Sequence, residues 1–204
     1  MRKLFFSVFV LISVVAHAQN TKPFKVNVAA GYAATADYSN SNALSKAGFV
    51  FSIEPQYRVI KNLDIGLRFE QAFIQRPEFI DKNIVFQTKT KSILSGAVTA
   101  NYSIPTGSTL QPYIGVGVGL YHASPSDQRS ASFGITTTYP LPATNVIGGL
   151  GRVGVKFGRI NLVGEYNLVS DAQVTVSATN LTLNAKNSYF SGKVGFTIGG
   201  GSTK

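Results

Sequence analysis

Residues 49–73 read FVFSIEPQYRVIKNLDIGLRFEQAF, and apolar and polar residues alternate along almost the whole stretch. Successive side chains of a β-strand point to opposite faces, so the alternation predicts two strands, each with an apolar face and a charged face. A membrane β-barrel needs this division, because lipid touches its outside while its lumen is polar. The apolar faces carry Phe49, Phe51, Ile53 and Tyr57 in the first strand, and Leu63, Ile65, Leu67, Phe69 and Phe73 in the second.

Eight segments of the chain show this alternation, and we expect each to form a strand. Three connections between them, at residues 60–62, 105–110 and 158–159, are short and contain Gly, Asn or Pro, as β-hairpin turns do. The other four connections are long and span residues 35–47, 76–91, 123–144 and 170–188. The expected strands span residues 24–34, 48–59, 63–75, 92–104, 111–122, 145–157, 160–169 and 189–199.

The alternation of short and long connections predicts the architecture. Outer-membrane barrels have an even number of antiparallel strands, short periplasmic turns and longer extracellular loops. No apolar run beyond the N-terminus reaches the length of a transmembrane helix, so a membrane-embedded chain must form a closed barrel. The sequence therefore predicts an all-β fold, an eight-stranded antiparallel up-and-down transmembrane β-barrel with both termini in the periplasm.

The first 18 residues have the three parts of a secretory signal peptide. Arg2 and Lys3 are positively charged, residues 4–15 are apolar, and Ala16-His17-Ala18 is a small-residue cleavage site. The expected organisation is a cleavable signal peptide at residues 1–18, followed by an outer-membrane barrel domain at residues 19–204.

Composition excludes several functions. The chain contains 19 Lys and Arg residues against 9 Asp and Glu, a net charge of +10, but no cluster of basic residues typical of nucleic-acid binding. It has no cysteine and only one histidine outside the first 18 residues, so we expect neither a disulfide framework nor a metal or other cofactor. The basic charge favours anionic lipopolysaccharide and outer-membrane lipid as partners.

The inward faces of the expected strands carry both acids and bases. Buried charges must be paired or hydrated, and an eight-stranded barrel is only wide enough for its own side chains to fill. We therefore interpret these charges as a structural polar network that fills the lumen, and a narrow conducting path is the alternative. The predicted network consists of Glu54, Arg58, Asp64, Arg68, Glu70, Arg152, Lys156, Glu165 and Lys193.

Two segments carry a resemblance to a known family. Residues 112–121 read PYIGVGVGLY, and residues 192–198 read GKVGFTI. The glycines of the first segment alternate with aliphatic residues and no helix follows, which excludes a phosphate-binding loop. With the signal peptide, these segments resemble the small OmpA/OmpX-like and OmpW-like outer-membrane barrels of Gram-negative bacteria. The resemblance implies a porin-family barrel whose C-terminal strand, with Lys193, Gly195 and Ile198, is read by the barrel assembly machinery. We expect the barrel to be a monomer.

The leading functional hypothesis is a barrel with no catalytic role that acts through its extracellular loops, in envelope integrity or surface binding. A narrow porin-like channel for small solutes is the second hypothesis. A lipid A-modifying enzyme is the third, because His122 and Ser124 resemble the His/Ser pair of lipid A deacylases, although no acid completes a triad. The fourth is a soluble periplasmic barrel that turns its apolar faces inward around a ligand. The second long connection has the densest loop charge, namely Arg76, Glu78, Asp81, Lys82, Lys89 and Lys91.

Overall fold

The computed structural model describes residues 23–36, 48–74, 79–81, 84–88, 91–132, 135–141, 143–170, 172–176, 181–185 and 187–200. The predicted signal peptide and the predicted loop charges of residues 76–91 lie outside the part whose side chains are described. Within that part, no helix is both long and apolar enough to cross a membrane.

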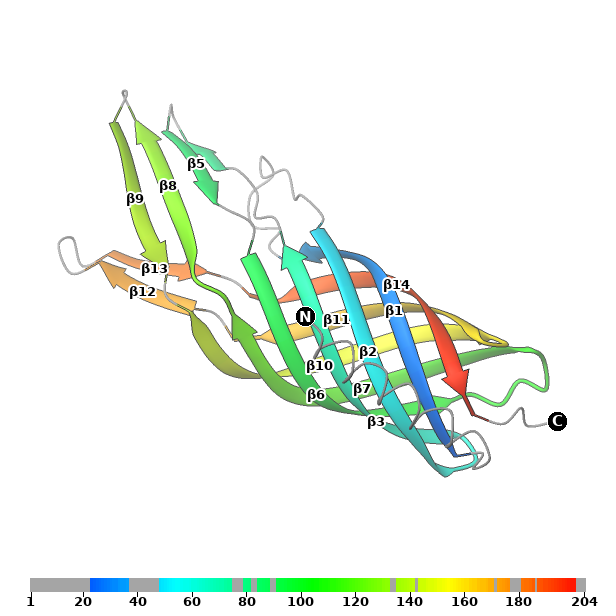
Figure 1. The fold of residues 1–204 in the computed structure, drawn as a ribbon. Helices are drawn as coiled ribbons and strands as arrows, with labels where there is room; N and C mark the ends of the chain where they lie inside the picture. The colour runs from blue at the N-terminus through cyan, green and yellow to red at the C-terminus, as the bar shows by residue number, and fades with distance from the viewer. Residues whose placement is uncertain are drawn as a thin grey trace, which may run out of the picture.

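Eight antiparallel strands close into a barrel in the order β1-β14-β11-β10-β7-β6-β3-β2 (Figure 1). The first and last strands of the chain complete the ring, with Lys25 opposite Gly199 and Thr35 opposite Tyr189. This confirms the predicted fold class, and the strand ends fall within one residue of the expected ones. The strands are β1 (Phe24–Thr35), β2 (Gly48–Ile60), β3 (Leu63–Ile74), β6 (Lys91–Ser103), β7 (Leu110–Ala123), β10 (Thr144–Phe157), β11 (Ile160–Val169) and β14 (Tyr189–Gly199).

The two ends of the barrel differ in their connections. Residues 61–62, 104–109 and 158–159 join strands at one end, which we call the turn rim. Gly107 and Gly158 have positive φ values of 67° and 57° there, a conformation that glycine adopts without steric cost. The opposite end, the loop rim, carries the long connections. In outer-membrane barrels the short turns face the periplasm, which assigns the turn rim to that side.

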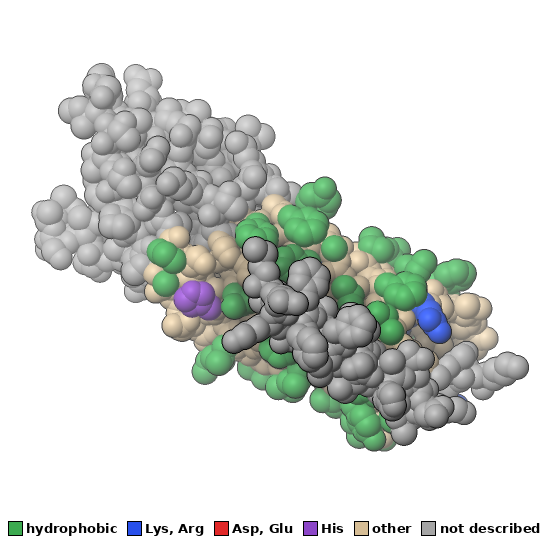
Figure 2. Space-filling model, viewed as in Figure 1, with side chains coloured by type: hydrophobic (Ala, Val, Ile, Leu, Met, Phe, Trp, Pro, Cys, Tyr) green, Lys and Arg blue, Asp and Glu red, His purple; other side chains and the backbone are tan. Residues whose placement is uncertain are grey.

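The outward face of the barrel is apolar, as the alternation predicts (Figure 2). Val116 and Leu67, for example, are 65% and 52% exposed, while Asp64, Arg68 and Glu70 of the same strand as Leu67 are buried inside. Val26 differs from the prediction, because it has outward parity but is only 7% exposed. Large exposed apolar surfaces mark interaction with a partner or a membrane, and a continuous apolar exterior is what a lipid-embedded barrel requires.

The long connections contain strands that the sequence analysis treated as loops. These are β4 (Phe79–Asp81), β5 (Ile84–Thr88), β8 (Ser126–Ser132), β9 (Ile135–Leu141), β12 (Ala172–Val176) and β13 (Leu181–Ala185). They form a four-stranded sheet, β4-β5-β8-β9, and a separate β12-β13 pair beyond the loop rim (Figure 1). The alternation of apolar and polar residues did not reveal these strands, because a strand outside the membrane needs no apolar face toward lipid.

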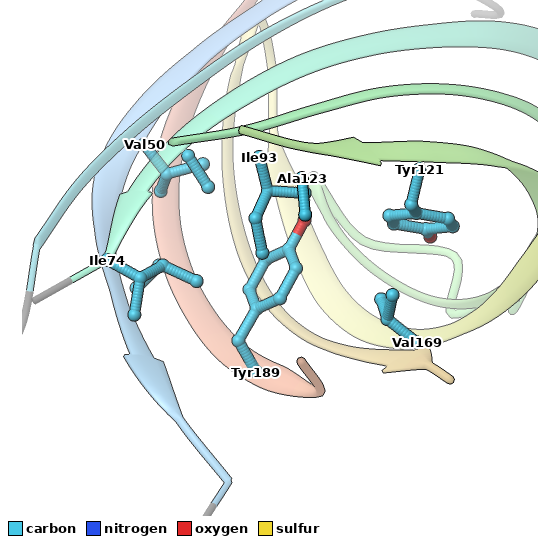
Figure 3. Close-up of a cluster of buried hydrophobic side chains, with 9 residues drawn as sticks. Val50, Ile74, Ile93, Tyr121, Ala123, Val169 and Tyr189 are labelled. Carbon is cyan, nitrogen blue, oxygen red and sulfur yellow. The ribbon is translucent and has the colours of Figure 1, made fainter. Parts of the chain in front are cut away.

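The lumen is apolar at the loop rim, which corrects the expectation of a charged inner face along the whole strand. Nine buried side chains pack together inside this end of the barrel (Figure 3). They come from seven of the eight barrel strands, so the cluster spans the lumen. Its members are Ala33, Val50, Ala72, Ile74, Ile93, Tyr121, Ala123, Val169 and Tyr189, and we call them the apolar plug.

Candidate functional site

The structure places all nine residues of the predicted network on the lumen side of the barrel wall. Seven are buried, whereas Lys156 and Arg58 lie near the turn rim with side chains that are 16% and 28% exposed. Two groups separate along the barrel axis. The central cluster comprises Glu54, Arg68, Glu70, Arg152, Glu165 and Lys193, and the basal cluster comprises Asp64, Arg58 and Lys156 together with Lys25.

Arg68 on β3 is the hub of the central cluster. Its guanidinium forms an ion pair with Glu165 on β11, a strand on the opposite side of the ring. Its planar fork of N–H donors suits several acceptors at once, and its side chain is completely buried. Its remaining acceptors are Glu70 at 3.2 Å, Ser95 at 3.2 Å, Tyr121 at 3.2 Å and Asn167 at 3.0 Å.

Glu70 links the central cluster to the apolar plug. Lys193 on β14 donates to one carboxylate oxygen of Glu70, and the hydroxyl of Tyr189 donates to the other at 2.7 Å. The ammonium of Lys193 also lies 3.3 Å from Glu165. Because the ring of Tyr189 belongs to the plug, its polar tip and apolar body join the two layers.

Arg152 on β10 binds Glu54 on β2 through two parallel hydrogen bonds, from Nη1 to Oε2 at 2.7 Å and from Nη2 to Oε1 at 2.6 Å. Its Nε donates to Asn101 at 2.7 Å, and Thr99 donates to Glu54 at 2.6 Å. Gly115 on β7 makes room for this arrangement, because a Cβ atom at that position would lie 2.3 Å from Oδ1 of Asn101.

The two clusters differ in charge. The central cluster pairs three cations with three carboxylates, so it is neutral. In the basal cluster, Asp64 is the single carboxylate, and it contacts Lys25, Arg58 Nε at 3.2 Å and Lys156 Nζ at 3.4 Å. Lys156 also donates to Ser103 at 3.1 Å and lies over the ring of Tyr113. The basal cluster therefore carries an excess positive charge.

The sequence analysis missed two charged or polar partners, Lys25 and Tyr189. Residues two apart in a strand point to the same face, so both side chains could have been assigned to the lumen. Lys25 stands two residues before the inward Asn27, and Tyr189 stands two before the inward Ser191. Sequence reasoning counted Lys25 toward the overall basic charge but did not give it a side of the wall. The pairing partners themselves, from strands far apart in the chain, become visible only once the ring closes.

Little space remains among the lumen side chains. A cavity of about 10 Å³ lies between the two clusters and is lined by Asn27, Ser52 and Asn161 among others. This volume is close to the smallest that holds one water molecule. Within the described residues, no group of three His, Asp or Glu side chains is placed to hold a metal ion. The ion pairs of the two clusters connect strands across the barrel, and their side chains fill the lumen.

His122, the residue considered for lipid A chemistry, lies on the outward face of β7. Its Nδ1 is 2.7 Å from Oδ1 of Asn145 on β10, its register partner in the neighbouring strand. The backbone N–H of Ser124 donates to the carbonyl of Ser92 at 2.9 Å. An amide oxygen can orient an imidazole but lacks the charge with which a carboxylate stabilises imidazolium.

An apolar exterior, eight up-and-down strands and charged side chains in the lumen define a small integral outer-membrane β-barrel protein. The family model of the outer membrane protein beta-barrel domain matches residues 4–202, and the chain belongs to this family. This confirms the predicted family and the predicted outer-membrane location.

The chain is similar to solved structures of two other proteins. The chain is 19% identical to Neisserial surface protein A. The match covers 86% of this chain and 96% of the Neisserial protein, with a TM-score of 0.53. It is 12% identical to Ail, the attachment invasion locus protein of Yersinia pestis, in complex with the heparin analogue sucrose octasulfate. That match covers 86% of this chain and 99% of the other, with a TM-score of 0.41. At these identities, the likeness to the Neisserial protein shows the fold alone. No curated protein sequence matches the chain significantly.

Proposed function

We propose that this protein is a non-enzymatic outer-membrane barrel with a closed lumen, which acts through its segments beyond the loop rim in envelope integrity or surface binding. The observation that carries the proposal is the contact between Arg68 and Glu165, because it joins opposite walls in the middle of the lumen. A barrel closed at this level holds its outer segments in place but does not pass solutes.

Two successive layers support a closed lumen. The apolar plug fills the loop-rim end, and the central cluster lies below it with Tyr189 shared between the layers. A hydrated ion would have to displace buried apolar side chains and then break paired charges, and both steps are costly. This favours a structural role for the lumen over the porin-like channel.

The segments beyond the loop rim have a rigid base. β8 begins three residues after the end of β7, and β9 ends three residues before β10 begins, so the β8-β9 hairpin continues two paired barrel strands. Binding functions are commonly carried by segments that a rigid scaffold positions in this way. We propose that these segments contact lipopolysaccharide, whose anionic groups suit the basic charge of the chain, which is +8 without Arg2 and Lys3 (17 Lys and Arg against 9 Asp and Glu).

Export and assembly complete the proposal. We propose that residues 1–18 are removed as a signal peptide and that the C-terminal strand β14 is read by the barrel assembly machinery. β14 closes the ring against β1, so its recognition would directly precede closure.

The test replaces residues 126–141, the β8-β9 hairpin, with a two-residue turn and leaves the barrel strands intact. A strain that lacks the gene is complemented with either form, and its resistance to detergents and large antibiotics is measured beside the uptake of a small sugar. We expect the shortened form to fail in restoring resistance while uptake is the same for both. Full restoration by the shortened form would overturn the role of this hairpin.

Two controls separate the alternatives. A His122→Ala variant should complement fully and leave lipid A acylation unchanged, whereas altered acylation would favour the enzyme. Purification of the folded protein in the soluble periplasmic fraction would favour the ligand-binding barrel. The apolar faces of its strands would then line a ligand pocket and would not face lipid.

A further inference from the structure

The turn rim of the barrel contains a second polar cavity, separate from the filled lumen above it. Its volume is about 580 Å³, and it opens at the end of the barrel where the short turns lie. Four basic side chains line it, Lys25, Arg58, Lys156 and Arg159, and no acidic side chain among the described residues does so. The cavity therefore presents positive charge toward the side that the short turns face.

We propose that this cavity is a binding site for a phosphate group supplied from the periplasmic side. The central cluster has no net charge with which to bind an anion, because its three cations are matched by three carboxylates. Asp64, by contrast, neutralises only one of the three cations that touch it. Arg159 adds a further positive charge from the β10-β11 turn.

The geometry of the basal cluster leaves donors available for a ligand. Arg58 contacts Asp64 through Nε alone, and among the described residues its two Nη groups have no hydrogen-bond partner. Asp64 itself is almost completely buried beneath the cavity, so it holds the cations in place without facing a ligand. A guanidinium fork beside two ammonium groups is well suited to the oxygens of a phosphate.

Electrostatics favours a multivalent anion at this position. Uncompensated positive charges at the mouth of a low-dielectric barrel focus the field and raise the local concentration of anions. Thr109 and Gln111 add polar side chains at the edge of the cavity. A phosphate carries two charges near neutral pH and offers several acceptors, so it matches the cavity better than chloride does.

The test is calorimetric titration of the folded protein in phosphatidylcholine nanodiscs with inorganic phosphate and pyrophosphate, at constant ionic strength maintained with sodium chloride. We expect saturable binding at one site per barrel. Arg58→Gln and Arg159→Gln should each weaken it about tenfold, which corresponds to about 1.4 kcal/mol. Lys61→Gln is the matched control, because Lys61 lies in a turn of the same rim but does not line the cavity.

The outcomes are distinguishable. Binding that fails to saturate, or an equal loss in all three variants, would overturn the site, because a general surface potential depends on charge and not on position. A repeat in phosphatidylglycerol nanodiscs identifies the source of the phosphate. Unchanged pyrophosphate binding indicates a soluble anion, whereas weaker apparent binding indicates that lipid headgroups occupy the same site. These results are independent of the proposed role of the loop-rim segments.

Discussion

Arg152 and Glu54 form a bidentate ion pair across the barrel lumen, with N···O distances of 2.7 and 2.6 Å. Their strands, β10 and β2, lie four places apart in a ring of eight, which is the largest separation the ring allows. The strands of Arg68 and Glu165, β3 and β11, have the same separation. Two ion pairs thus join opposite walls of the barrel, and the proposal of a closed lumen rests on them.

Breaking the Arg152–Glu54 pair should destabilise the barrel because one buried charge loses its partner. We expect Arg152→Met to lower the free energy of unfolding by about 3–5 kcal/mol. Combining it with Glu54→Gln should recover much of the loss, since the double variant buries no lone charge. Urea titration in micelles measures both changes in the free energy of unfolding. Unfolding is followed by circular dichroism, because the chain contains no tryptophan. Additive losses in the double variant would show that the two side chains act independently.

The hydroxyl of Tyr189 should contribute more to stability than a tyrosine hydroxyl on the lipid face. Tyr189→Phe removes a donor to the buried carboxylate of Glu70, at a cost of about 1–3 kcal/mol. Tyr102→Phe is the control, because Tyr102 is exposed on the outward face and should change stability by less than about 0.5 kcal/mol. The same urea titration compares the two variants, and equal effects would contradict the assigned role of Tyr189.

A charge on the outward face should be costly in proportion to its depth in the membrane. Val116 lies in the middle of β7 and Leu110 at its turn-rim end, and both are exposed. We expect Val116→Arg to cost about 2–4 kcal/mol and Leu110→Arg about 0–1 kcal/mol. Unfolding from lipid vesicles gives both values. Similar costs at the two depths would argue against a lipid-embedded exterior.

Gly115 and Gly151 should respond differently to the same substitution. In Gly115→Ala, the new Cβ would lie 2.3 Å from Oδ1 of Asn101, which is itself held by Arg152. We expect a loss of about 1–3 kcal/mol from overpacking. Gly151 faces outward with no atom near its Cβ position, so Gly151→Ala should be neutral or slightly stabilising. Thermal unfolding in micelles decides between them, and tolerance of both would contradict the packing of Gly115.

Alternation of residue type was sufficient to predict the barrel strands and the side of the wall on which the nine residues of the predicted network lie. The period of a strand is two, so one apolar face determines the position of every other residue in it. The same rule holds for Lys25 and Tyr189, which the sequence analysis left unassigned to either side of the wall.

Two features could not be predicted by this rule. Val50, Ile74 and Ile93 are apolar and point inward. Where both faces of a strand are apolar, the sequence shows no alternation from which the inward face could be predicted. The strands beyond the loop rim have no lipid face, so their pairing depends on the backbone and on neighbours distant in sequence. Charge partners such as Arg68 and Glu165, 97 residues apart, likewise follow from ring closure.

The most direct test of a closed lumen is single-channel recording of the purified protein in planar lipid bilayers. Correct folding is verified first by the shift in gel mobility between unheated and boiled samples. The account predicts a silent bilayer for the folded protein across a range of voltages and salts. Reproducible conductance steps from the folded protein would contradict it, and would show that ions pass the apolar plug and the central cluster.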